Sequence, residues 1–93
     1  ISKDGVIIVV AEVDSQTGQI VDYPTIISRG LPNQENRTAN KKVAQDVKSA
    51  FIQGKGRVTD WTYIRKKIGE ISEKSVLKHL RRRPLVLPVV IEV

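Results

Sequence analysis

The chain opens and closes on short apolar segments in which β-branched residues dominate. Residues 6–13 read VIIVVAEV and residues 85–93 read LVLPVVIEV, and this composition predicts a strand in each. A further extended segment spans residues 19–30 and is interrupted at Pro24. The turn-forming sequence DSQTG at residues 14–18 separates it from the first strand, so we expect the two to form an antiparallel hairpin.

Two helical patterns occupy the middle of the chain. The first covers residues 38–53 and carries an apolar stripe at helical spacing, made of Ala39, Val43, Val47 and Ala50. The second covers residues 60–82, with a stripe made of Trp61, Ile64, Ile68 and Ile71. Thr59 or Asp60 can cap the second helix, and Pro84 stops it because the residue before a proline avoids helical geometry.

The elements therefore follow in the order strand, strand, helix, helix, strand. This order predicts an α+β fold in which a three-stranded sheet is packed on one face by two helices. Residues 1–93 are enough for a single domain with one modest core. The chain contains no Met, so we expect it to be a fragment of a longer protein.

The predicted sheet has apolar side chains on both faces. In residues 6–13 and in residues 85–93, both alternating sets of side chains are largely apolar, whereas a sheet with one wet face alternates apolar and polar residues. Two helices cover one face, so we expect the other to meet a second copy or the rest of a larger protein. The candidate assembly residues are Val6, Ile8, Val10, Leu77, Val86 and Val90. Alternatively, the polar loop after Gly30 folds across this face.

Charge favours a polyanionic partner without identifying one. Lys and Arg number 16 against 10 Asp and Glu, which gives a formal net charge of +6. RNA is a possible partner, through phosphate contacts from Lys41, Lys42, Lys78, Arg81, Arg82 and Arg83. The alternative for the arginine run is a structural role, because cations at a helix C-terminus interact favourably with the helix dipole.

Several classes of function are disfavoured by what the sequence lacks. Without Cys it can form neither a disulfide nor a thiolate metal site, which fits a cytoplasmic protein. The closing apolar run is far shorter than the ~20 residues that span a bilayer, so no membrane partner is expected. His79 is the sole histidine, and GKGR at residues 54–57 lacks the spacing of a phosphate loop. We therefore predict no catalytic residue, metal ligand or cofactor within this chain.

Two segments resemble the C-terminal domain of bacterial ribonuclease J. These are TIISRG at residues 25–30 and RRPLVLPVVIEV at residues 82–93, of which the second is long and specific. DGVIIVVAEVDSQTGQIV at residues 4–21 and DW at residues 60–61 are also similar, so the resemblance covers nearly the whole chain. The chain departs from the family pattern at LPNQENRTANKK, residues 31–42, where relatives often carry aromatic and acidic residues.

The resemblance implies a parent enzyme of the metallo-β-lactamase/β-CASP family. Such a parent is a cytoplasmic, zinc-dependent endonuclease and 5′-to-3′ exonuclease in RNA maturation and decay, and its zinc ligands and catalytic residues lie upstream. The family's C-terminal domain is a three-stranded sheet facing two helices. It supports the formation of dimers or tetramers and the activity of the parent catalytic body. This agrees with the residue-level expectation of a non-catalytic domain that needs a partner surface.

Overall fold

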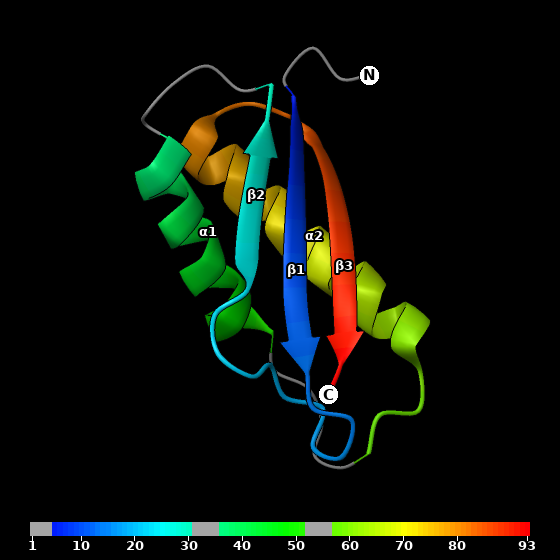
Figure 1. The fold of residues 1–93 in the computed structure, drawn as a ribbon. Coiled ribbons are helices and arrows are strands. Elements are labelled where there is room, and N and C mark those ends of the chain that lie inside the picture. The colour runs from blue at the N-terminus through cyan, green and yellow to red at the C-terminus, as the bar shows by residue number, and fades with distance from the viewer. Residues whose placement is uncertain (1–4, 31–35, 52–56) are drawn as a thin grey trace.

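Three strands and two helices make up the part of the chain that the computed structural model describes, residues 5–30, 36–51 and 57–93. The elements are β1 (Val6–Val13), β2 (Thr25–Arg29), α1 (Asn36–Ala50), α2 (Trp61–Leu80) and β3 (Leu85–Glu92). Both helices lie on the same side of the sheet, behind it in Figure 1. The predicted α+β architecture and its order of elements are confirmed.

The sheet has the strand order β2-β1-β3, which brings the closing strand beside the opening one. β1 pairs with β2 in antiparallel fashion, with Val6 opposite Arg29, so the predicted hairpin is confirmed. β1 pairs with β3 in parallel, with Val6 opposite Leu85, and both helices lie in the connection between β2 and β3. β3 is therefore an edge strand, and an edge is where Pro88 can be accommodated, because proline has no N–H to donate to a ladder.

A side-chain contact shapes one end of the hairpin, and a close backbone approach shapes the other. The carboxylate of Asp14 accepts hydrogen bonds from the backbone N–H groups of Gln16 and Thr17, at 2.8 Å and 3.2 Å. This is the turn predicted for residues 14–18. At the opposite end Gly5 has a φ of +86°, and a Cβ atom there would lie 2.6 Å from the carbonyl oxygen of Arg29. The start of β1 and the end of β2 thus approach more closely than any other residue at position 5 would permit.

The caps of α2 explain where the longer helix begins and ends. The Asp60 carboxylate accepts a hydrogen bond from the N–H of Tyr63 at 3.0 Å, so Asp60 is the N-cap. Arg81 has a left-handed φ of 54°, and its N–H donates to the carbonyl of Leu77. The helix therefore ends at Leu80, two residues before the predicted end at residue 82, because Arg81 adopts the left-handed conformation ahead of Pro84.

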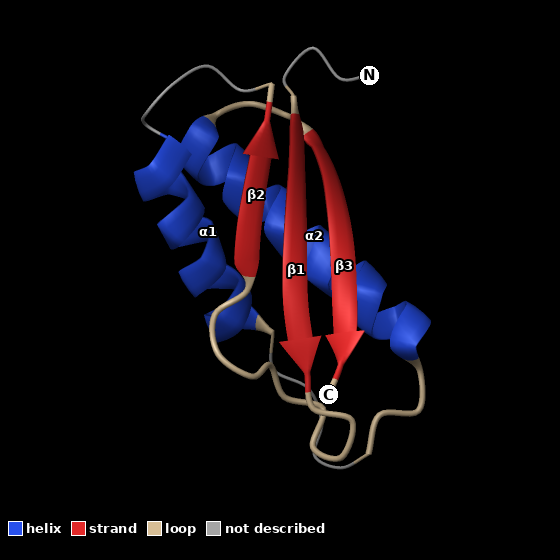
Figure 2. Cartoon of the chain, in the orientation of Figure 1, coloured by secondary structure: helices blue, strands red, loops and turns tan. Residues whose placement is uncertain are grey.

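The core lies between the sheet and the helices. β1 contributes Ile7, Val9, Ala11 and Val13, all with no exposed surface. Opposite them pack Val43, Val47 and Phe51 from the α1 segment and Ile64, Ile68 and Val76 from α2. At Gly69 an added Cβ would lie 3.3 Å from Cγ of Pro88, so the absence of a side chain there lets α2 approach β3 closely. Among the described residues no helix covers the other face of the sheet (Figure 2).

Candidate functional site

The sheet face that the helices leave open is apolar. In the parallel pair Ile8 lies opposite Leu87, and in the hairpin Ile8 lies opposite Ile27, so these three side chains share that face. The alternate residues of the closing segment extend it. Each of them is between 41% and 52% exposed: Leu85, Leu87, Val89, Ile91 and Val93. We call Val6, Ile8, Val10, Ile27 and these five residues the open face.

Three of the six predicted assembly residues lie on the open face and three do not. Val6, Ile8 and Val10 are there, partly buried. Val86 and Val90 pack against the core on the opposite face, so their predicted placement is wrong. The reason is the register: Val86 lies opposite the buried Ile7, so the odd-numbered residues of β3 share a face with the even-numbered residues of β1. Leu77 is 39% exposed but lies on α2, away from the sheet face.

The identity of the open strand face could not be decided from the sequence, because both alternating sets of β3 are apolar. Glu92 is the charged residue of the strand, and its charge wrongly suggests that its own alternate set of side chains faces solvent. It belongs to the set that faces the helices, and it is exposed at the last position of β3. The alternative covering for the open face, the loop after Gly30, falls at residues 31–35 and so lies outside the described residues.

Charges of opposite sign lie at the two ends of the open face. Arg29 lies opposite Val6 at one end, and Glu12 lies opposite Ile91 toward the other end, and both are exposed. Glu12 is the sixth residue after Val6 along β1, which corresponds to a distance of about 20 Å in an extended strand. The open face is therefore an apolar surface with a cation at one end and an anion at the other.

The predicted phosphate contacts do not come together in one cluster. Lys41 and Lys42 are exposed on α1, Arg81 caps α2, and Arg82 and Arg83 line a small pocket with Glu73 and Leu77. Lys78 instead lines a groove between α1 and α2, together with Lys67 and Lys74, which are not among the predicted phosphate contacts. Lys67 and Lys74 are seven residues apart, and this spacing indicates that they share one face of a helix. The sequence does not indicate that this face borders a groove, because that depends on how α1 crosses α2.

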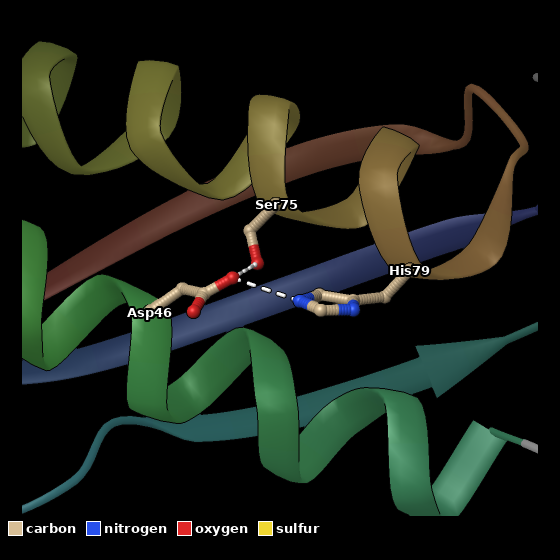
Figure 3. A network of polar contacts seen from close by, with 3 residues as sticks. All are labelled: Asp46, Ser75 and His79. Atoms are coloured by element: carbon tan, nitrogen blue, oxygen red, sulfur yellow. Dashed lines mark hydrogen bonds and ion pairs between the residues drawn. The ribbon is translucent and has the colours of Figure 1, made fainter.

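The same two helices are joined by a polar network (Figure 3). Oδ2 of Asp46 on α1 accepts a hydrogen bond from the Ser75 hydroxyl at 2.8 Å and lies 2.9 Å from Nε2 of His79, both on α2. The hydrogen bond from Ser75 holds the pKa of Asp46 below its ordinary value, and contacts with His79 and the charge of Lys78 act in the same direction against partial burial.

The sole histidine of the sequence, His79, thus contacts a carboxylate and is not fully exposed. Its side chain is 17% exposed and its partner lies 33 residues away, beyond the reach of a local pattern. The arrangement is not that of an activated nucleophile, because the Ser75 hydroxyl donates to the carboxylate rather than to the imidazole. It ties α1 to α2.

No metal centre forms within the described ranges, where no three His, Cys, Asp or Glu side chains gather at ligating distance. None of the helices in the same ranges has the length and apolar character needed to cross a bilayer.

Comparison with known proteins identifies the family. The model of the ribonuclease J C-terminal domain matches residues 1–93. The chain belongs to this family. Ribonuclease J2 of Bacillus subtilis (strain 168) is 24% identical over 95 residues, which cover all of this chain and 17% of that protein. Ribonuclease J 2 of Staphylococcus aureus (strain NCTC 8325 / PS 47) is 26% identical over 98 residues, with the same coverage.

This ribonuclease J C-terminal domain thus spans about 17% of the length of the curated relatives that it matches. The resemblance carried by TIISRG and by the closing segment is confirmed, and it extends over the whole chain. By their names these relatives are ribonucleases, which are hydrolases of RNA.

Proposed function

We propose that this chain is a non-catalytic assembly domain of a ribonuclease of the J type, and that its open face binds a second copy of the same domain. The observation that carries the proposal is the row of half-exposed apolar side chains from Leu85 to Val93 on a sheet face without a covering helix. A contiguous apolar surface of this kind marks an interaction site more often than a solvated face.

A rough balance of energies fits reversible self-association. Complete burial of an exposed Val, Leu or Ile side chain contributes ~1.5–3 kcal/mol. The five side chains of the closing segment are already about half buried, so covering them adds on the order of 4–8 kcal/mol from each copy. Association itself costs ~4–15 kcal/mol in lost translational and rotational freedom. We therefore expect a measurable but weak dimer of the isolated domain, which further contacts would strengthen in a larger protein.

The charges at the ends of the open face favour a second copy over an unrelated surface. Two sheets can stack face to face about a two-fold axis that runs either along or across the strands. An axis across the strands places Arg29 of each copy over the end of the other copy that carries Glu12, so opposite charges meet at both ends of the dimer. An axis along the strands would place like charges together, so we expect the first arrangement.

In the whole enzyme this dimer contact is one step toward a dimer or tetramer, and the domain also contacts the catalytic body. Zinc binding and the endonuclease and 5′-to-3′ exonuclease chemistry of RNA maturation and decay belong to that body, in the cytoplasm. The support is the family membership, together with the lack of a ligating cluster among the described residues.

Sedimentation velocity of the domain over a wide range of concentrations tests the proposal. We expect the sedimentation coefficient to rise with concentration toward that of a dimer. A strictly monomeric domain at the highest concentration would refute the self-association. To separate assembly from catalysis, the whole enzyme with a disrupted open face should lose its oligomeric state while its zinc content stays unchanged.

A further inference from the structure

A groove runs between the end of α1 and the middle of α2, on the side of the molecule away from the open face. It has a volume of about 530 Å³ and is bordered on the α2 side by Lys67, Lys74 and Lys78, with Ile71 between them. From α1 the groove receives Asp46 and the small residues Ser49 and Ala50. The small residues leave the groove wide and open to solvent.

The three lysines form one row along α2. Lys67 and Lys74 are seven residues apart and therefore lie on the same side of the helix, about 10.5 Å apart along its axis. Lys78 follows one turn later, about 6 Å further on. The row is thus about 16 Å long, and all three side chains are exposed. A row of cations of this length matches a linear polyanion better than a single small anion.

Within the described residues the ammonium groups of the row form no direct ion pair, and the carboxylate of Glu70 lies one turn along α2 from Lys67 and from Lys74. In the described ranges the one salt bridge joins His79 to Asp46. Asp46 is the single carboxylate that borders the groove, and its Oδ2 is occupied by the contacts with Ser75 and His79. Lys78 is close enough to lower the pKa of Asp46 through its charge, yet forms no contact with it.

We propose that this groove binds the phosphate backbone of single-stranded RNA. Lysine ammonium groups contact phosphates as point charges and read no bases, so binding should be independent of sequence and steeply dependent on salt. The half-buried Ile71 offers an apolar floor against which a ribose or an unpaired base can rest. Among polyanions RNA is favoured because the chain belongs to a ribonuclease family.

This site goes beyond the assembly role and is independent of it. The groove lies in the helix layer, whereas the open face is the opposite surface of the sheet (Figure 1). A dimer formed through the open faces would therefore carry two outward-facing grooves. Loss of RNA binding would leave self-association intact, and disruption of the open face would leave RNA binding by each copy intact.

Fluorescence anisotropy with a labelled oligouridylate tests the inference on the 93-residue chain, once cooperative thermal unfolding shows each variant to be folded. The variant carries Lys67→Gln, Lys74→Gln and Lys78→Gln. The control carries Lys41→Gln, Lys42→Gln and Arg65→Gln, which removes the same charge from exposed positions outside the groove. Poly-glutamate serves as a competitor that has charge but neither ribose nor base.

We expect the groove variant to bind at least tenfold more weakly than the wild type at low salt, and the control less than threefold. Each phosphate contact to a single strand contributes about −0.7 to the slope of log affinity against log salt, so loss of three contacts should reduce the slope by about 2. Equal losses in variant and control would overturn the site, as would the absence of wild-type binding at low salt. Equal competition by poly-glutamate at matched charge would overturn the assignment to RNA.

Discussion

Ile8 of β1 and Leu87 of β3 are direct partners in the parallel pair, and both side chains point to the face of the sheet that the helices leave open. The pairing matters because the register of β3 decides which alternate set of its apolar residues is exposed. With Ile8 beside Leu87, the set that includes Val86 and Val90 completes the core, and the set from Leu85 to Val93 is available to a partner.

The charges at the ends of the open face should control self-association. Glu12→Arg places two cations at each end of the expected dimer, and we predict at least a tenfold loss of dimer affinity at low salt. Arg29→Glu should have a similar effect. The double variant, or an equimolar mixture of the two single variants, should recover most of the affinity, because opposite charges face each other again. Sedimentation equilibrium measures all four samples, and failure of the mixture to recover would contradict the two-fold arrangement.

Removal of the Asp46 carboxylate should loosen the contact between α1 and α2. Asp46→Ala leaves the buried Ser75 hydroxyl without its acceptor, so we expect the free energy of unfolding to fall by about 1–3 kcal/mol. Ser49→Ala on the exposed side of the same helix is the control, since it has a similar effect on helix propensity. Urea denaturation gives both values, and equal stabilities would show that the network contributes nothing.

The same carboxylate should make part of the stability depend on pH. Because the pKa of Asp46 in the folded state lies below its ordinary value of 3.8, the charged form stabilises the fold above that value. This contribution disappears as the pH falls through the lowered pKa. The difference in unfolding free energy between wild type and Asp46→Asn should therefore be present at pH values above 3.8 and shrink as the pH falls below that value. A difference that stayed constant or grew as the pH fell below 3.8 would contradict the pKa direction.

Two glycines at one end of the hairpin should respond differently to alanine. Gly5 and Gly30 both have positive φ values, +86° and +73°, so each substitution incurs a cost of about 1–2 kcal/mol for left-handed backbone. At Gly5 the new Cβ would also lie 2.6 Å from the backbone oxygen of Arg29, whereas at Gly30 the nearest atom is 3.4 Å away. We predict that Gly5→Ala is the more destabilising change in thermal unfolding, and an equal effect would show that the close approach is unimportant.

The sequence predicted what depends on local chemistry. Neighbouring residues set the strand and helix patterns, the Asp14 turn and the N-terminal cap of α2, for which Thr59 and Asp60 were the two candidates. It failed where a long-range register decides the outcome, as at Val86 and Val90, because a shift by one residue exchanges the two faces of a strand. The contact between Asp46 and His79 and the groove beside Lys67 and Lys74 depend in the same way on how two helices cross.

Substitution of one residue at the centre of the open face tests the assembly role most directly. Leu87→Lys places a charge in the middle of the apolar row, and Leu77→Lys, at a residue of similar exposure on α2 and away from the sheet face, is the control. Sedimentation velocity over a concentration series should show wild type and Leu77→Lys shifting toward a dimer, while Leu87→Lys stays monomeric with its thermal unfolding intact. Unchanged self-association of a folded Leu87→Lys variant would contradict the claim that the open face is the assembly surface.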